Sequence, residues 1–229
     1  MSEMADASVV DGQASAASAD APHFLYFADP MCSWCYGFSP AITALQSQFA
    51  GRLPVRIVVG GLRAFNERAM RAEDKAYIRD AWGRVHQASG QPFDHAFFER
   101  ENFVYDTEPA CRAIVTMRRR APAKALAMMA AISSAFYAKN RDTTDTDVLT
   151  DIAASLGEDS EAFRAEFVSP EARNETVADF QFAQQAGISG FPCLVAGTMA
   201  GGYTLVTNGY RPLDGLSEAI EAWLARQAA

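Results

Sequence analysis

Residues 29–38 read DPMCSWCYGF and place Cys32 and Cys35 near the front of the chain, separated by two residues. Just before this stretch, HFLYFA at 23–28 forms an apolar run that predicts a buried β-strand. After Cys32, apolar side chains recur every three or four residues up to position 49, which indicates a helix with one apolar face. A second β-branched run at 55–61 completes a βαβ unit, with the cysteine pair where its helix begins.

Length and charge restrict the class of protein. The chain has 229 residues, 49% of them hydrophobic, which is enough for a sizeable core. A formal net charge of −8 argues against general affinity for nucleic acid or an anionic membrane. Residues 1–21 contain no lysine or arginine and no continuous apolar core, unlike a secretory signal. We therefore expect a disordered tail there and a cytoplasmic protein.

The rest of the chain divides into a helical block and a second β-containing segment. From residue 66 the apolar period is helical; Met70, Tyr77 and Trp82 are expected on one helix face, and Thr107 is expected to cap the next helix. The β pattern returns at 193–197 and 203–209, followed by a last helix at about 212–226. The order predicts an α/β fold with a large all-helical insertion between its halves. We assign 1–21 to the tail, 22–64 and 175–229 to the α/β domain, and 65–174 to the insertion.

The surroundings of the cysteine pair indicate its chemistry. A structural zinc site normally takes four Cys or His ligands, and the other candidates are single residues: Cys111, Cys193, His23, His86 and His95. A metal-binding or interaction module is therefore the non-enzymatic alternative. A Cys-x-x-Cys pair beside a βαβ pattern indicates thioredoxin-like redox chemistry instead.

Position assigns different roles to the two sulfurs. A helix N-terminus stabilises negative charge, and the thiolate is the form of cysteine that attacks a disulfide. Cys32 lies just ahead of the helix, so we expect it to attack and Cys35, one turn inside, to resolve the mixed disulfide. No bound cofactor is expected, because electrons would pass through the pair itself.

Four motifs together resemble the DsbA-like thioredoxin-fold oxidoreductases, and most closely a cytoplasmic branch described as proposed protein-disulfide isomerases. The motifs are YFADPMCSWCYGF at 26–38, VVGGLRAFN at 58–66, EPACRAI at 108–114 and GISGFPCLV at 187–195. The resemblance implies a thioredoxin fold and a disulfide reductase or isomerase that acts on protein or small-molecule disulfides with an unidentified recycling partner. It also implies that Pro192 is a cis-proline opposite the cysteines, and that the backbone of Phe191 pairs with substrate.

The chain departs from DsbA at the residues next to the cysteines. Ser33 and Trp34 replace the Pro-His of DsbA, and Tyr26 stands where DsbA has a buried acid. We therefore expect a reductant or isomerase rather than a strong oxidant. Asp29 and Glu108 are candidate proton acceptors, although solvating a loop or favouring a helix start is the expected role of each.

Two further residues and one rival family leave alternatives open. Trp34 is either a substrate platform or a core residue. Cys193 is expected to be a small buried hydrophobic residue rather than a third redox thiol. The rival function is a glutathione-dependent isomerase or transferase, resembling the 2-hydroxychromene-2-carboxylate isomerases and kappa-class transferases. Those enzymes usually have serine at the nucleophile position and lack the second cysteine, whereas this chain has a cysteine at both positions.

Overall fold

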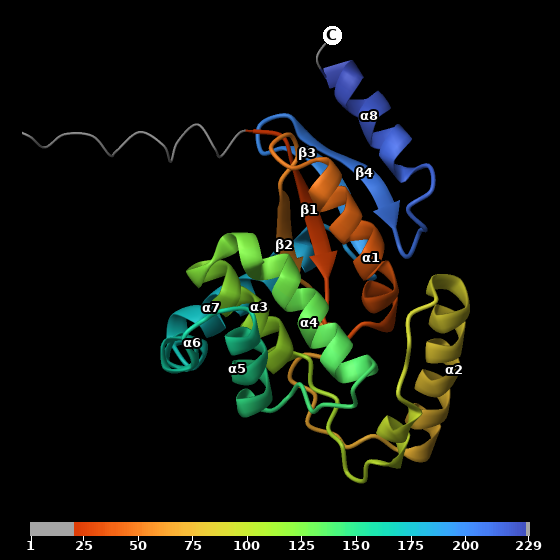
Figure 1. The fold of residues 1–229 in the computed structure, drawn as a ribbon, viewed down its shortest axis with the longest axis vertical. Coiled ribbons are helices and arrows are strands. Elements are labelled where there is room, and N and C mark those ends of the chain that lie inside the picture. The colour runs from red at the N-terminus through yellow and green to blue at the C-terminus, as the bar shows by residue number, and fades with distance from the viewer. Residues whose placement is uncertain (1–20, 228–229) are drawn as a thin grey trace, which may run out of the picture.

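Strand β1 (His23–Ala28) lies inside the fold, and all six of its residues are buried. In the computed structural model, which describes residues 21–227, β1 pairs in parallel with β2 (Val55–Val59) and antiparallel with β3 (Cys193–Thr198). Strand β3 pairs antiparallel with β4 (Gly202–Asn208), so the described strands form one sheet in the order β2-β1-β3-β4 (Figure 1). The continuous apolar character of HFLYFA follows from this position, because a strand covered on both faces has no solvent side.

Helices cover both faces of the sheet and fill the chain between β2 and β3. In chain order they are α1 (Ser33–Gln48), α2 (Ala72–Ser89), α3 (Glu108–Arg120), α4 (Ala125–Tyr137), α5 (Thr146–Ser155), α6 (Ser160–Phe167), α7 (Pro170–Gln185) and α8 (Leu216–Gln227), with short 3-10 helices at His95–Glu99 and Pro122–Lys124. The predicted order, βαβ then helices then ββα, is confirmed.

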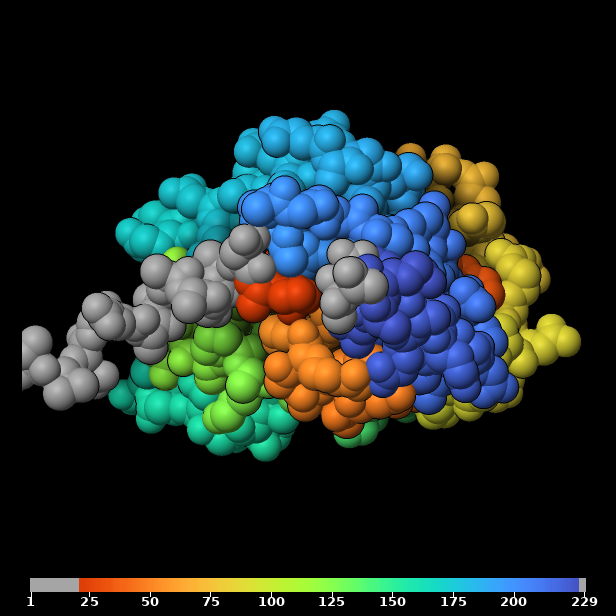
Figure 2. Space-filling model, turned by 90° about the horizontal axis from the view of Figure 1, so that it is seen from above, coloured from red at the N-terminus to blue at the C-terminus, as the bar shows by residue number. Residues whose placement is uncertain are grey.

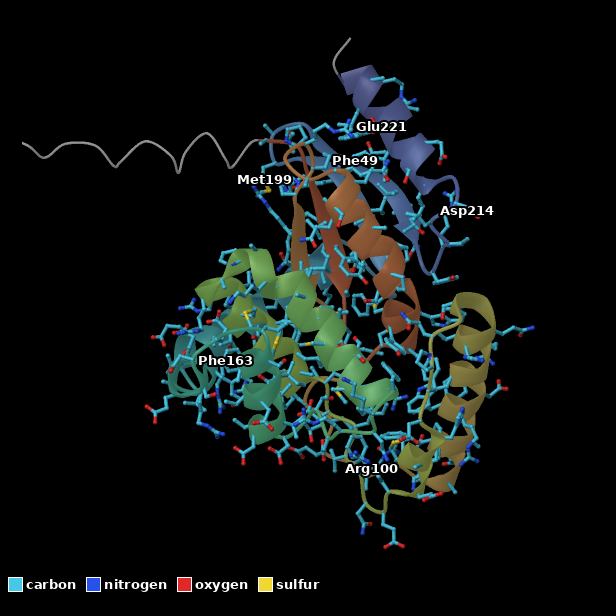
Figure 3. All side chains as sticks on the ribbon, viewed as in Figure 1. Phe49, Arg100, Phe163, Met199, Asp214 and Glu221 are labelled. Atoms are coloured by element: carbon cyan, nitrogen blue, oxygen red, sulfur yellow. The ribbon has the colours of Figure 1, made fainter. Side chains whose placement is uncertain are left out.

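Alternate side chains of β1 enter two separate cores. Phe24 and Tyr26 belong to the large core, which includes residues of α1, α3, α4 and α8. Leu25 and Phe27 face the other way and pack with Ala183 of α7 in a smaller cluster. The same large core includes Phe163 of α6, which Figure 3 shows among the helices distant from α8. The large core therefore joins the sheet to the helical insertion. Met199, at the β3–β4 turn, is by contrast exposed.

Ion pairs attach the helices to the sheet and to the loop that precedes β2. The guanidinium of Arg118 on α3 donates to the carbonyl oxygen of Ile57 at 2.6 Å and pairs with Asp179 of α7 at 2.8 Å. At the other end, Arg52 pairs with Glu221 of α8 at 2.6 Å, where Figure 2 shows the last helix lying against the α1–β2 segment. The Arg118 contacts tie α3, α7 and β2 together behind the cysteine-bearing end of the sheet.

Several local expectations differ from the structure. Tyr77 was expected on the apolar face of its helix but is 67% exposed, because that face turns only Ile78, Trp82 and Val85 inward. Thr107 precedes α3, yet its hydroxyl accepts from the backbone amide of Arg63 at 3.2 Å and makes no capping hydrogen bond.

Some predicted boundaries are shifted or remain predictions. The second strand ends at Val59 rather than at residue 61, and the last helix begins at Leu216 rather than at about 212. The expected tail lies outside the described residues except for position 21. The division into domains stays a prediction, and its boundary after 174 falls inside α7. Within residues 21–227, no helix is both long and apolar enough to cross a membrane.

Candidate active site

Cys32 occupies the position directly before the first turn of α1. Its backbone is extended, with φ −93° and ψ 118°, and its carbonyl accepts from the amide of Tyr36 at 3.0 Å. The first turn of α1 contains no acidic residue, so nothing there offsets the positive end of the helix dipole. Cys32 therefore stands directly before the free backbone amides of the first turn of α1, the position that the sequence indicated.

The chain segment before β3 lies opposite Cys32. The Phe191–Pro192 peptide bond is cis, which confirms that expectation for Pro192. The thiol of Cys32 donates to the carbonyl oxygen of Phe191 across 3.6 Å. The carbonyl of Pro192 in turn accepts from the amide of Gly209 at 2.7 Å, which holds this segment against the start of the loop after β4. The structure thus brings together three predicted residues from opposite ends of the chain.

Cys35 is more enclosed than Cys32. The exposed fraction is 1% for Cys35 and 6% for Cys32, and both residues are free thiols. Burial, and then the neighbouring Cys32, raises the pKa of the Cys35 thiol well above its ordinary value. Cys35 therefore keeps its proton at neutral pH in the dithiol state, and Cys32 is the more accessible residue of the pair.

Asp29 does not solvate a loop, and that expectation was wrong. The residue is completely buried, and its carboxylate accepts from the backbone amides of Met31 at 2.8 Å and Leu62 at 2.7 Å. It also accepts from the thiol of Cys111 at 3.5 Å. Burial raises the pKa of the carboxyl, and the hydrogen bonds from Leu62 and Met31 oppose that shift. The carboxylate thus joins the active-site loop to the segment after β2.

Two residues of the helical block hold the same loop from the other side. The hydroxyl of Tyr105 donates to the carbonyl of Met31 at 2.6 Å, and the hydroxyl of Ser133 on α4 donates to the carbonyl of Pro30 at 2.8 Å. Tyr105 also shares a 3.2 Å hydrogen bond with Tyr137. Sequence reasoning missed all three, because no local pattern shows that a tyrosine 74 positions after Met31 will meet its carbonyl.

A groove with a volume of about 330 Å³ opens beside Cys32. Its lining includes Trp34, Phe191 and the guanidinium-bearing residues Arg63 and Arg84. Trp34 is half-buried, and its ring lies 5.6 Å from that of Tyr210. The alternatives for Trp34 therefore merge, since one part of the side chain packs while another lines the groove.

The other candidate residues lie apart from the groove or serve the fold. Cys193 is 2% exposed in the smaller core, and burial raises the pKa of its thiol, which agrees with a buried hydrophobic role. Glu108 lies in the first turn of α3 and pairs with Arg112 at 2.8 Å, as a helix-start residue would. Within residues 21–227, no group of three or more His, Cys, Asp or Glu side chains could hold a metal ion.

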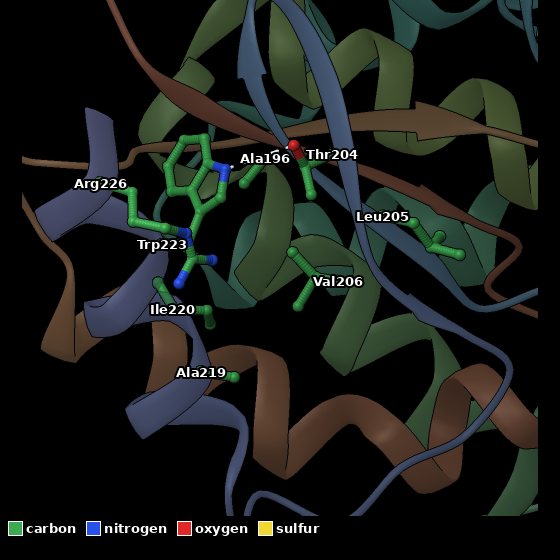
Figure 4. Close-up of a pocket in the computed structure, with 8 residues that line it drawn as sticks. All are labelled: Ala196, Thr204, Leu205, Val206, Ala219, Ile220, Trp223 and Arg226. Atoms are coloured by element: carbon green, nitrogen blue, oxygen red, sulfur yellow. Dashed lines mark hydrogen bonds between the residues drawn. The ribbon is translucent and has the colours of Figure 1, made fainter.

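A second pocket lies away from the cysteines. Its volume is about 170 Å³, and residues of β4 and α8 line it, among them Val206, Ile220 and Trp223 (Figure 4). The indole of Trp223 donates to the hydroxyl of Thr204 at 3.3 Å, so these two polar groups of the pocket are already hydrogen-bonded to each other. No cysteine lines this pocket, whereas Cys32 lines the groove described above.

Comparison with known proteins agrees with this geometry. A model of the DSBA-like thioredoxin domain matches residues 25–221. A proposed protein disulfide isomerase from Nitrosomonas europaea superposes with a TM-score of 0.82 at 38% identity, covering 90% of this chain and 99% of that one. The cytosolic disulfide reductase DsbM from Pseudomonas aeruginosa gives 0.73 at 27% identity, covering 89% and 98%, and has also been solved with GSH.

Curated relatives are more distant. The ClpXP adapter protein SpxH of Bacillus subtilis (strain 168) is 23% identical over 170 residues, which are 73% of this chain and 56% of SpxH. SpxH of Halalkalibacterium halodurans is 23% identical over 176 residues, again 56% of that protein. The chain therefore spans a little over half the length of the curated relatives that it matches.

Gly60 leaves room for the ring of Phe191, and this contact can be tested. A β-carbon at Gly60 would lie 2.0 Å from the ring of Phe191, so Gly60→Ala must displace the ring. We expect the free energy of unfolding to fall by about 1–3 kcal/mol, the usual cost of overpacking. We also expect slower disulfide exchange at Cys32, because the displaced residue carries the carbonyl that faces its sulfur. Denaturant titration and exchange kinetics measure the two effects.

Gly83 on α2 is the matched control. A β-carbon there meets nothing within 4 Å, so Gly83→Ala should raise the free energy of unfolding by about 0.5–1 kcal/mol through helix propensity alone. Its exchange rate should equal that of the wild type. Wild-type stability and kinetics in Gly60→Ala would show that the position of Phe191 does not depend on the missing side chain at Gly60.

Proposed function

The chain belongs to the DSBA-like thioredoxin domain family, and from this premise we propose that it is a thiol–disulfide oxidoreductase working through the Cys32–Cys35 pair. The observation that carries the proposal is the contact of the Cys32 thiol with the carbonyl of Phe191. It places the more accessible sulfur of the pair at a helix start, beside a backbone segment that an extended substrate could use. Cys35 lies behind it, buried and within the same helix.

The proposed reaction has two exchange steps. The thiolate of Cys32 attacks one sulfur of a substrate disulfide, forms a mixed disulfide and releases the other substrate sulfur as a thiolate. Cys35 then loses its proton and attacks the Cys32 sulfur, so the Cys32–Cys35 bond forms and the second substrate thiolate leaves. The substrate gains two electrons, and the protein is left as a disulfide that a thiol-containing recycling partner must reduce.

We place the protein among the reductases and isomerases of the cytoplasm. The absence of a histidine between the cysteines supports this direction, since no imidazolium charge stabilises the Cys32 thiolate from the intervening positions. The similar DsbM is named a cytosolic disulfide reductase, and the similar Nitrosomonas protein a proposed disulfide isomerase. Isomerisation would follow when substrate cysteines, rather than Cys35, resolve the mixed disulfide.

The groove beside Cys32 favours a small anionic substrate. Arg63 and Arg84 both line it, and the guanidinium of Arg63 lies 5.2 Å from the ring centre of Tyr105. The positive charge of Arg63 suits a carboxylate of oxidised glutathione, whereas Arg84 is already paired with Asp80. The structure of DsbM with GSH supports the same substrate class.

A protein-binding adapter is the second candidate function. The curated relatives are named ClpXP adapter proteins, and Leu62 and Tyr77, which line the groove, are exposed, as is Phe65. An adapter would need these surfaces but not the chemistry of the cysteines, so binding of a partner should survive loss of Cys32. A glutathione-dependent isomerase or transferase, the remaining alternative, would not need Cys35.

Trapping the mixed disulfide tests the proposed roles. In Cys35→Ser, a disulfide substrate should leave one of its halves attached to Cys32, because the resolving sulfur is missing. Cys32→Ser should lose disulfide reduction altogether, whereas Cys193→Ala, a buried cysteine outside the site, should retain it. Mass spectrometry of the adduct and a reductase assay measure these outcomes. An adduct on Cys35 of Cys32→Ser, with none on Cys32 of the other variant, would reverse the roles.

A charge-specific assay tests the substrate class. Arg63→Gln should raise KM for oxidised glutathione about fivefold, the effect of losing one partly exposed ion pair, and leave the neutral hydroxyethyl disulfide unchanged. Arg79→Gln is the control, since Arg79 lies on α2 over the ring of Phe98 and does not line the groove. An equal rise in KM for both disulfides would mean that Arg63 shapes the groove rather than recognising charge.

A further inference from the structure

The hydroxyl of Tyr26 is a buried polar group without a hydrogen-bond partner among the described residues. The residue lies on β1 and has no exposed surface, and its ring packs 5.9 Å from that of Phe38 on α1. An unpaired buried hydroxyl costs stability, and phenylalanine would fill the same space without that cost. Another state of the cysteine pair is therefore where we expect the hydrogen-bond partner that this hydroxyl lacks in the dithiol state.

Tyr26 and Cys35 belong to the same buried core cluster, so the phenol lies in the dry region that also holds the Cys35 sulfur. Burial raises the pKa of the Tyr26 phenol well above its ordinary value, and negative charge on Cys35 and then on Cys32 raises it further. A side-chain contact with Cys35 contributes as well, although in this state it falls short of hydrogen-bond geometry. The phenol therefore keeps its proton throughout the working pH range and can act only as a donor or as the acceptor of a thiol proton.

We propose that Tyr26 donates a hydrogen bond to the Cys35 sulfur whenever that sulfur carries negative charge. The inference rests on the proposed function, because Cys35 is charged only while it resolves a mixed disulfide or leaves from the Cys32–Cys35 bond. A donor already fixed in a dry site stabilises a developing charge without having to reorganise. In the dithiol form the hydroxyl has no partner among the described residues, and this lowers the stability of that form.

The step that Tyr26 assists can be written in full. Cys35 first loses its proton, which ends on the substrate thiolate released by the first attack, and the resulting Cys35 thiolate accepts the hydrogen bond from Tyr26. The thiolate attacks the Cys32 sulfur of the mixed disulfide, the Cys32–Cys35 bond forms, and the substrate sulfur leaves with the electron pair. Both cysteines are oxidised, and the substrate disulfide has been reduced to two thiols. In the reverse direction, the same hydrogen bond stabilises Cys35 as the leaving group.

An aromatic disulfide that absorbs on reduction, such as Ellman's reagent, separates the two sulfurs. Reduced protein should release one aromatic thiolate as Cys32 attacks and a second as Cys35 resolves. Tyr26→Phe should leave the first phase unchanged and slow the second about three- to tenfold at neutral pH. The pH profile of the second phase should shift to higher pH, because Cys35 would ionise less readily without its donor.

Stability of the dithiol form provides the second readout. Tyr26→Phe should unfold at the same or higher denaturant concentration than the wild type, because the lost hydroxyl had no partner. Tyr36→Phe is the matched control, since it removes a hydroxyl of α1 that donates to the carbonyl of Pro92 at 3.1 Å. That variant should lose stability and keep both phases of thiolate release.

Two results would overturn the inference. One is a second phase in Tyr26→Phe as fast as in the wild type. The other is a loss of stability together with equal slowing of both phases, which would make Tyr26 a structural residue. Failure of the proposed function looks different, because wild-type protein would then release only one aromatic thiolate and form no Cys32–Cys35 bond.

Discussion

The buried carboxylate of Asp29 is the constraint on which the geometry of the site depends. It accepts hydrogen bonds from the amides of Met31 and Leu62, and so joins the loop before Cys32 to the segment after β2. That second segment begins with Gly60, whose missing side chain leaves room for Phe191. One carboxylate thereby connects the sulfur of Cys32 to the carbonyl of Phe191 that faces it, although the two residues are 159 positions apart.

The helical insertion takes part in the site as well as in the core. Tyr105 and Ser133 hold the carbonyls of Met31 and Pro30, and Cys111 of α3 donates to Asp29 from below the loop. Every polar backbone group named here in the loop before Cys32 is thus paired with the insertion or with Asp29. Such pairing holds the start of α1, and Cys32 with it, in place.

Local pattern was sufficient for the sheet and for the cysteine pair, and insufficient for the groups around them. The apolar run of β1 and the helix after Cys32 show their period directly, and the family resemblance supplied the cis bond at Pro192. Asp29 was misjudged because a carboxylate in a loop normally faces water, whereas here the nearby amide of Met31 and the distant amide of Leu62 compensate for its burial. Thr107 was misjudged for a similar reason, since the amide of Arg63 takes the hydroxyl that would have capped α3.

A redox titration with thiols counted by mass spectrometry tests the central claim most directly. Protein equilibrated in buffers of graded potential should show a single two-electron transition confined to Cys32 and Cys35, with Cys111 and Cys193 remaining thiols throughout. Its midpoint should lie nearer the value of about −270 mV for thioredoxin than that of about −120 mV for DsbA. A transition that includes Cys111 or Cys193, or the absence of any two-electron transition, would contradict the account.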